Sequence, residues 1–306
     1  MKLLANLLVS FFAFSIFFSF FFYFVYPKEL YDFCSFLRAE NANLKDREIK
    51  IGSNFLHFYE GENLHKKDTI VILHGWGDNR KGFLKLAKYL SQDYYLIIPD
   101  LYNYEEYDFN YQVSIVTKLL DTLNIRQCHF VGVSSGGLIP LSLAVKRPKL
   151  VKSIILVNTP YLDLRVENEK FIKFFSKKVS NSSDLDMVLA SLFYDKPKFS
   201  KPIEKMLIKQ VDTDLKFVNT HIIPKIKYSE FSNLENTLTS SNVPTLVLHS
   251  TYDELIRVKS ASMYVKLLPS STYGTISNTS HFPHYETPIY LASSITNQIE
   301  SIKFKH

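Results

Sequence analysis

Residues 128–145 place an apolar run, a turn of small residues and a second apolar run in immediate succession. The β-favouring residues Cys128 to Val131 lead into Gly132-Val133-Ser134-Ser135-Gly136-Gly137. A strand that reverses into a helix within one or two residues strains its turn residue, and small neighbours allow the two elements to approach closely. The pattern G-x-S-x-G has these mechanics and raises a serine hydroxyl clear of the sheet. A tight crossover without chemistry needs the same glycines, so the surrounding sequence must decide between the two.

Apolar runs alternate with helical patterns on both sides of this turn. Strands are predicted as a pair within 47–60 and then at 69–73, 94–99, 128–131, 151–157, 243–249 and 272–277. Helices are predicted at 83–90, 113–123, 138–146, 258–268 and 288–304. Strands that alternate with helices at this spacing imply right-handed crossovers and a mostly parallel sheet. The fold class is therefore α/β, with a doubly wound sheet.

The alternation stops between residues 161 and 240. This stretch is rich in lysine, shows several helical periodicities and has no strand-like run of comparable strength. We interpret it as a helical insertion that rests on the sheet. An independent helical domain is the alternative, but no low-complexity linker flanks the stretch on either side.

Residues 3–26 contain no charged side chain and nine phenylalanines. A helix of this length would measure about 36 Å, which exceeds the hydrocarbon core of a bilayer. We predict that residues 1–27 form an uncleaved, single-pass membrane anchor, with a cleaved signal peptide of a secreted or periplasmic protein, or a buried core helix, as alternatives. A signal peptide should end in small residues, whereas this segment ends in Phe24-Val25-Tyr26-Pro27. Residues 28–46 are polar and are predicted to form a tether.

The charge distribution narrows the range of partners. The formal net charge of +6 is spread along the chain without a basic block, so nucleic acid is not a predicted partner. The two cysteines, Cys34 and Cys128, do not indicate a disulfide, because Cys128 falls in a predicted buried strand. No cofactor is predicted.

Four predicted strands are followed by residues that carry chemistry. His74-Gly75-Trp76-Gly77 follows 69–73, Ser134 follows 128–131, Asp253 lies four residues beyond 243–249, and His281 follows 272–277. The carboxyl ends of parallel strands meet at one edge of a sheet, where ligands bind in doubly wound folds. A serine, an aspartate and a histidine are thus expected at a common edge, in that chain order.

Over residues 47–304 the chain resembles the α/β-hydrolase superfamily, in its branch of serine hydrolases related to esterases and lipases. The resemblance is carried by H-G-x-G at 74–77, G-x-S-x-G-G at 132–137, Asp253 after its strand, and the run H-x-P-x-x-E-x-P at His281, Pro283, Glu286 and Pro288. It implies an α/β-hydrolase domain over 47–304, in which the helical stretch at about 161–240 is a lid.

The resemblance and the chemistry of the side chains assign the same roles. Ser134 is expected to be the nucleophile, His281 the base that takes its proton, and Asp253 the carboxylate that orients the imidazole. The backbone N–H groups of Trp76 and Ser135 are expected to form an oxyanion hole. Losing one such donor typically raises the reaction barrier by about 3–4 kcal/mol.

Several of these residues have alternative interpretations. Asp253 has the position of a helix N-cap for the segment that begins near Leu255. His284 competes with His281 for the role of base, and a metal site at His281, His284 and Glu286 is conceivable from the ligand types, although the helical i, i+4 spacing of zinc enzymes is absent. We interpret His74 as structural, and we predict no metal.

Two departures from the superfamily pattern affect the predicted site. Ser280 and Ser250 stand where glycine is usual, although both are small enough to preserve the turn. The segment after Asp100 lacks the Arg-Gly-x-Gly turn of the superfamily, which leaves one wall of the pocket unpredicted.

The favoured function is hydrolysis of a small carboxylic ester or thioester through an acyl-enzyme on Ser134. The alternatives are a membrane-surface lipase, a pimeloyl-carrier-protein methyl ester esterase, to which the His-Gly-Trp-Gly turn bears a slight resemblance, and a hydrolase of carbon–carbon bonds. A catalytically silent, membrane-tethered binding protein is the alternative of a different class. A membrane partner is expected through the N-terminal segment, and no oligomeric state is predicted.

Overall fold

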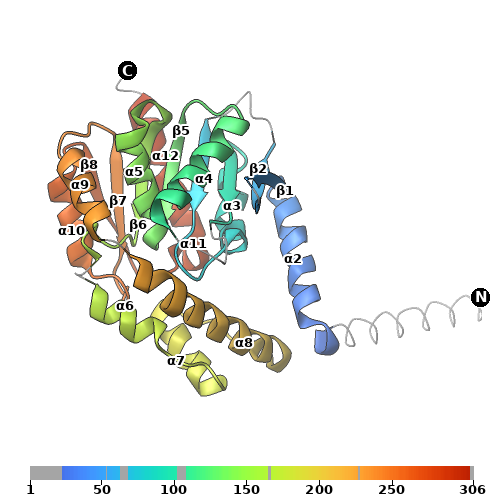
Figure 1. Cartoon of the computed structure of the whole chain (residues 1–306). Helices are drawn as coiled ribbons and strands as arrows, with labels where there is room; N and C mark the ends of the chain where they lie inside the picture. The colour runs from blue at the N-terminus through green and yellow to red at the C-terminus, as the bar shows by residue number, and fades with distance from the viewer. Residues whose placement is uncertain are drawn as a thin grey trace, which may run out of the picture.

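The computed structural model describes residues 23–52, 54–62, 68–101, 108–164, 167–226 and 228–303, and strands alternate with helices along most of this chain (Figure 1). The strands are β1 (Leu44–Ile51), β2 (Asn54–Gly61), β3 (Thr69–Leu73), β4 (Tyr95–Pro99), β5 (Cys128–Val133), β6 (Val151–Val157), β7 (Thr245–Ser250) and β8 (Ser271–Ile276). The α-helices are α2 (Pro27–Asn41), α3 (Leu84–Leu90), α4 (Phe109–Thr122), α5 (Leu138–Lys146), α6 (Asn168–Phe175), α7 (Ser182–Leu192), α8 (Lys201–Phe217), α9 (Tyr228–Leu238), α10 (Val258–Leu267), α11 (Pro283–Glu286) and α12 (Pro288–Lys303).

The strands form one sheet in the order β1-β2-β4-β3-β5-β6-β7-β8. β1, β2 and β4 pair antiparallel, and every pairing from β4 through β3 to β8 is parallel. The predicted mostly parallel sheet is therefore confirmed. β3, β4 and β5 are buried along their whole length, as continuous apolar runs in a parallel sheet should be.

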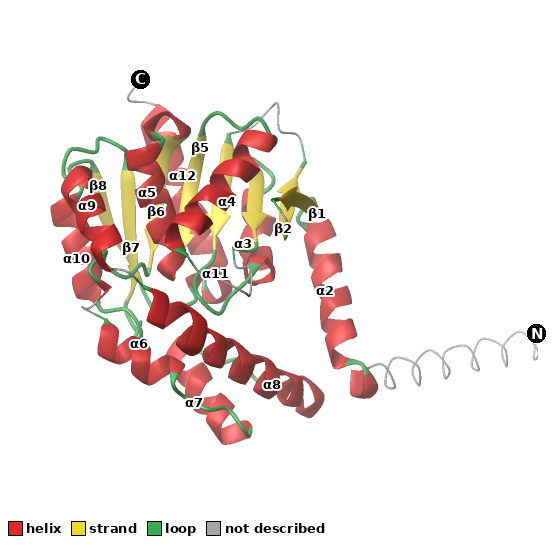
Figure 2. Cartoon of the chain, in the orientation of Figure 1, coloured by secondary structure: helices red, strands yellow, loops and turns green. Residues whose placement is uncertain are grey.

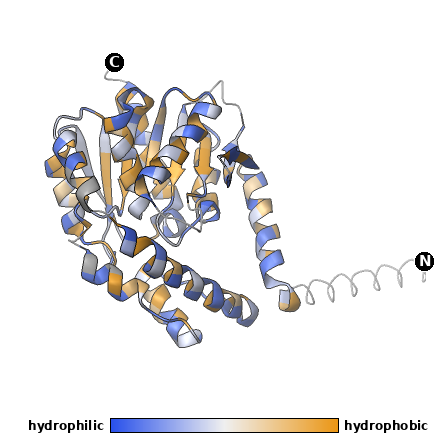
Figure 3. Cartoon of the chain, in the orientation of Figure 1, coloured by the Kyte–Doolittle hydropathy of each residue, from blue (hydrophilic) through white to orange (hydrophobic). Residues whose placement is uncertain are grey.

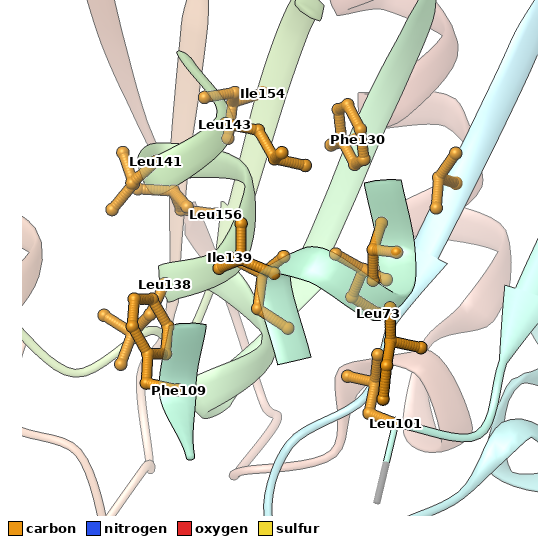
Figure 4. Close-up of a cluster of buried hydrophobic side chains, with 14 of the residues drawn as sticks. Leu73, Leu101, Phe109, Phe130, Leu138, Ile139, Leu141, Leu143, Ile154 and Leu156 are labelled. Carbon is orange, nitrogen blue, oxygen red and sulfur yellow. The ribbon is translucent and has the colours of Figure 1, made fainter. Parts of the chain in front are cut away.

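Helices cover both faces of the sheet (Figure 2). On one face α4, α5, α9 and α10 pack their apolar side chains against β5 and β6, and Figure 4 shows part of this core with Phe130, Leu143, Ile154 and Leu156. On the other face α2, α3 and α12 cover Ile70, Val131 and other residues of the central strands. The central strands are mainly hydrophobic, whereas the edge strand β1 and the outer faces of the helices are polar (Figure 3).

The predicted helical stretch at 161–240 contains α6, α7, α8 and α9, between β6 and β7. Figure 1 shows α6, α7 and α8 together at the edge where the parallel strands end, while α9 returns to pack against α5. Side chains of the insertion such as Leu215 and Phe231 share one hydrophobic cluster with those of the sheet. The insertion and the sheet are thus joined by a continuous core.

The predicted anchor at 1–27 falls outside the described residues except for its last five. Among the described residues, none of the helices combines the length and apolar character that crossing a membrane requires. The structure corrects the interpretation of 28–46 as a tether, because this segment forms helix α2 and the first residues of β1. Ala39 and Leu44 are buried against the sheet core, and Lys81 Nζ lies 2.7 Å from Asp32 Oδ1 of α2.

Candidate active site

Ser134 occupies the sharp turn between β5 and the helix that follows it. Its φ of +53° lies in the left-handed region, which is costly for a residue with a side chain. The surrounding glycines have no room for a side chain, since a Cβ on Gly132 would lie 2.3 Å from the Cα of Gly137. A Cβ on Gly136 would lie 2.4 Å from the carbonyl oxygen of Leu73. Strand, strained serine and close-packed helix thus have the local geometry that the motif predicts.

The side chains of Asp253 and His281 form a hydrogen-bonded pair. The distance from His281 Nδ1 to Asp253 Oδ2 is 2.8 Å, and the two side chains are only 4% and 0% exposed. Because a carboxylate can only accept, this bond places a proton on Nδ1, and in the neutral form of the imidazole Nε2 is then the acceptor. That tautomer is the one a general base requires.

Asp253 also holds the backbone of the segment that follows it, but it is not a helix N-cap, because the next helix, α10, begins at Val258. Its Oδ1 accepts hydrogen bonds from the backbone N–H groups of Leu255 and Ile256, both at 2.9 Å. One carboxylate oxygen therefore fixes the turn after β7 and the other contacts the imidazole. The two sets of bonds are compatible, because those to the turn hold the carboxylate toward His281.

Ser134 and His281 line the same cavity, which has a volume of about 150 Å³. Trp76 and Gly77 of the H-G-x-G turn line it as well. The residues that follow β3, β5 and β8 thus meet at one edge of the sheet. This convergence is the arrangement expected from the positions of the four predicted strand ends.

The H-G-x-G turn lies directly against the serine turn. The backbone N–H of Trp76 donates to Ser135 Oγ at 2.9 Å, and a Cβ on Gly75 would lie 2.7 Å from the Cβ of Ser134. The Ser135 backbone begins a helical turn that leads into α5. The two predicted oxyanion donors therefore belong to segments that flank Ser134 on both sides.

His74 and His284 have other partners. His74 Nδ1 donates to the carbonyl oxygen of Gly75, and its Nε2 accepts from the backbone N–H of Leu101, both at 2.9 Å. The interpretation of His74 as structural is confirmed, since both ring nitrogens hold the turn in place.

His284 stacks on Phe83 with ring centroids 4.4 Å apart, and its Nε2 lies 3.3 Å from Asp78 Oδ2. Burial opposes ionisation of Asp78, but the hydrogen bond and charge of His284 outweigh burial and lower the pKa of that carboxyl. His284 therefore pairs with Asp78, whereas His281 pairs with Asp253.

Glu286, the third residue of the alternative metal site, binds backbone groups of two separate segments. Its Oε2 accepts from the N–H of Ser280, and its Oε1 accepts from the N–H groups of Tyr194 and Asp195 at the end of the α7 segment. The backbone N–H of His281 also donates to the carbonyl oxygen of Leu192. The loop that carries His281 is therefore fastened to the helical insertion.

Asn158 is a site residue that the sequence analysis missed. It is fully buried at the end of β6, where its Oδ1 accepts from the backbone N–H of Ser250. Its Nδ2 donates to Ser250 Oγ and to the carbonyl oxygens of Ser280 and His281 at 2.9–3.2 Å. One amide thus joins the turn after β7 to the loop of His281. The only sequence signal is a polar residue directly after a buried strand.

The two serines that replace glycine in this site also make hydrogen bonds. Ser250 Oγ accepts from Asn158, and Ser280 Oγ donates to the carbonyl oxygen of Tyr252 at 3.0 Å. The expectation that small side chains preserve the turns holds. The hydroxyls additionally tie the two turns together.

Helices of the insertion supply most of the cavity wall. Its lining from α6, α7, α8 and the segments near them consists of Phe174, Phe175, Val188, Leu189, Leu192, Phe193, Val211, Asp214 and Leu215. Asp214 is the acidic member of this set. Burial is the main cause that raises the pKa of its carboxyl to about 6, against a hydrogen bond from Gln210 that lowers it.

Comparisons with known proteins agree with this fold. A family model described as the alpha/beta hydrolase fold matches residues 68–184. Lipase 3 of Moraxella sp. (strain TA144) is 22% identical over 80% of this chain and 81% of its own length, and Lipase 1 of Psychrobacter immobilis is 24% identical over the same shares. A crystal structure of a bacterial membrane phospholipase A superposes with a TM-score of 0.77, at 21% identity, over 99% of both chains.

The chain has the α/β-hydrolase fold and is similar to lipases over about four fifths of its length. The motifs that carry this similarity are local in sequence, and the structure places each of them at the carboxyl edge of the sheet. Asn158 and Asp214 contribute to the same region without belonging to a motif. Their positions depend on strand order and on the path of the insertion, which a single sequence does not reveal.

Proposed function

We propose that this α/β-hydrolase cleaves carboxylic esters through an acyl-enzyme on Ser134. His281 is the general base, Asp253 orients it, and the backbone N–H groups of Trp76 and Ser135 bind the oxyanion. The observation that carries the proposal is the 2.8 Å hydrogen bond from His281 to Asp253 at the wall of a cavity that Ser134 shares.

The proposed reaction has two balanced halves. Ser134 Oγ attacks the ester carbonyl while His281 Nε2 takes its proton, and the imidazolium that forms returns the proton to the leaving alkoxide. Water then attacks the acyl-enzyme with the same base, and Ser134 leaves as the hydroxyl. Negative charge on the carbonyl oxygen is stabilised in both halves by the two main-chain donors.

Because the cavity is mainly apolar, we propose that the acyl chain of the substrate enters it. Phe174, Val188 and Leu215 of the insertion offer hydrophobic contact on the side opposite Ser134 and His281. We propose that α6, α7 and α8 form a lid that selects the acyl group. Lipases and esterases among the relatives support an ester as the bond that is cleaved.

One observation favours a membrane-surface lipase as a second, more specific candidate. Helix α2 exposes Phe33, Phe36 and Leu37 at 56%, 53% and 49%, and these residues lie on one helical face. An exposed apolar helix face is suited to the interface of a bilayer. The uncharged residues 3–22 precede this helix in sequence, and α2 contacts helix α8 of the proposed lid.

Labelling with a fluorophosphonate probe tests the proposed reaction. We expect the full chain to be labelled and to hydrolyse nitrophenyl esters, and we expect Ser134→Ala to lose both. A panel of esters from acetate to palmitate then reports how long a chain the cavity accepts. A folded chain that neither reacts with the probe nor hydrolyses any ester would instead support the silent binding protein.

A further inference from the structure

Asp214 places one carboxyl group on the apolar side of the cavity. It lies on α8 and lines the cavity together with Val211 and Leu215 of the same helix, and Ser134 and His281 line it from the sheet edge. An acidic side chain in such surroundings is unfavourable unless its charge has a partner. Among the described residues the charge has no cationic neighbour in the cavity lining, which makes the group a candidate for ligand recognition.

The carboxyl is held in a defined position by its own helix. Gln210, one turn earlier on α8, donates from Nε2 to Oδ1 at 2.9 Å and to Oδ2 at 3.1 Å. A carboxylate has roughly four acceptor positions on its two oxygens, and one shared amide hydrogen does not exhaust them. The side chain is therefore fixed in direction and retains the capacity to accept a hydrogen bond from a molecule in the cavity.

The charge of the Asp214 carboxylate favours neutral ligands that donate a hydrogen bond over anionic ligands. The negative charge of Asp78 acts on Asp214 in the same sense as burial, and both raise the pKa of its carboxyl. In a cavity of low polarity a second anion is repelled, whereas a hydroxyl group gains a charge-assisted hydrogen bond. Such bonds contribute more than neutral ones, and a tenfold change in affinity corresponds to about 1.4 kcal/mol.

We propose that Asp214 is a specificity-determining residue that selects neutral esters carrying a free hydroxyl group and disfavours anionic ligands. This inference rests on the proposed ester hydrolysis, because it concerns the substrate of that same cavity. Hydrolysis converts a neutral ester into a carboxylate, so Asp214 also weakens binding of the acid product. Asp214 thus binds the hydroxyl group of the incoming ester and promotes release of the anionic acid product.

Trp76 provides a direct measurement of binding. It is the only tryptophan of the chain and lines the cavity, so its fluorescence reports occupancy. The experiment uses the full chain with Ser134→Ala, at pH 8, and three ten-carbon probes below their micellar concentrations. These are a decyl ether of glycerol, decyl methyl ether and decanoate. A fourth probe, 10-hydroxydecyl methyl ether, places the hydroxyl at the other end of the chain.

We expect one of the hydroxylated ethers to bind about tenfold more tightly than decyl methyl ether, and decanoate to bind most weakly. Adding Asp214→Leu should abolish the advantage of the hydroxylated probe and strengthen decanoate binding about tenfold. Asp214→Asn retains the size of the side chain and the bond to Gln210 but removes the charge. This variant should strengthen the binding of decanoate to a similar extent and leave the binding of the neutral probes unchanged. The asparagine variant keeps the test valid if the leucine variant does not fold.

Asp212→Asn is the matched control. Asp212 lies on the same helix and carries the same charge, but its Oδ1 accepts from the backbone N–H of Val179 and it is not part of the cavity lining. This variant should leave the order of the probes unchanged. If Asp214→Leu keeps the order of affinities, or if Asp212→Asn alters decanoate binding equally, the inference is overturned. Binding is measured without turnover, so an inactive wild-type chain that still discriminates the probes would refute the proposed function alone.

Discussion

The backbone N–H of Trp76 donates a hydrogen bond to the side-chain oxygen of Ser135 at 2.9 Å. This bond joins the turn after β3 to the turn after β5, two segments that are 59 residues apart in sequence. It places the Trp76 N–H beside the turn of the proposed nucleophile and gives this donor an acceptor. In the proposed oxyanion hole the N–H exchanges the Ser135 hydroxyl for the substrate oxygen as negative charge develops there.

Gly75→Ala should disable the site while leaving the fold intact. The added methyl group would lie 2.7 Å from Ser134 Cβ and 3.2 Å from its Oγ, so the two turns must move apart. We expect kcat/KM for a short ester to fall by about 100-fold or more, since losing a single oxyanion donor has an effect of this size.

Gly52→Ala is the control for Gly75→Ala. Gly52 has a φ of +65° and open space around it, so alanine adds backbone strain of about 1–2 kcal/mol without a clash near the site. Thermal unfolding and ester hydrolysis measured on both variants separate stability from activity. Normal activity in folded Gly75→Ala would contradict the proposed oxyanion arrangement.

Asp253→Asn should remove catalysis and retain the turn. The amide oxygen can still accept from Leu255 and Ile256, but the amide NH₂ then faces His281 Nδ1 and favours the wrong tautomer. By analogy with other Ser-His-Asp sites, kcat should fall by about 10³–10⁴-fold. If hydrolysis of a nitrophenyl ester is unaffected, Asp253 only holds the turn after β7.

Asn158→Ala should lower kcat through the position of His281. The substitution leaves the backbone N–H of Ser250 and the carbonyl oxygens of Ser280 and His281 without their buried partner. Each such group typically costs about 1–3 kcal/mol of stability. We expect a lower melting temperature and a fall of at least about tenfold in kcat with little change in KM.

Asn124→Ala is matched to Asn158→Ala in backbone conformation. The two residues have φ values of +56° and +48°, so alanine is similarly strained at both positions. Asn124 lies between α4 and β5, before the start of the strand whose other end leads into the turn of Ser134. Equal losses of activity in the two variants would mean that backbone strain, and not the hydrogen bonds of Asn158, affects the site.

The raised pKa of Asp214 predicts how stability varies with pH. Burial raises this pKa to about 6 in the folded chain, above the ordinary value of an aspartate. The folded state therefore holds the proton more tightly, and its stability falls as the pH rises from about 4 to about 6. At pH 3.5–4 the melting temperature of Asp214→Asn should equal that of the wild type. As the pH rises to 7, the variant should become progressively more stable than the wild type. A temperature difference that does not vary with pH would contradict this prediction.

The exposed face of α2 predicts a specific effect on substrates in bilayers. Replacing Phe33, Phe36 and Leu37 by serine in the full chain removes apolar area without touching the buried residues Ala39 and Ser35. We expect slower hydrolysis of a long-chain ester in phospholipid vesicles and unchanged hydrolysis of a soluble acetate ester. Chemical cross-linking of the wild type and the same variant tests whether a second copy of the chain binds this face instead of a bilayer. Loss of cross-linked dimer with unchanged activity on vesicles would contradict the membrane interpretation.

The strands and the turns that carry chemistry were predictable because they depend on neighbouring residues. Continuous β-branched runs such as 69–73 favour buried parallel strands wherever they occur, and the glycines at 132 and 136 restrict the serine turn to one geometry. The order of the motifs then placed Ser134, Asp253 and His281 at one edge. By contrast, the polar segment at 28–46 was misinterpreted, since only its few buried positions, such as Ala39, show that it packs as a helix.

The sequence by itself determined the sheet, the serine turn and the residues expected to share an edge, because local periodicity and turn chemistry encode these features. Only the tertiary structure decided that Asn158 joins two turns, that Glu286 fastens the helical insertion to the loop of His281, and that Asp214 lies in the cavity. These contacts connect residues up to 123 positions apart. Their partners are chosen by strand order and by the path of the insertion, which no local pattern records.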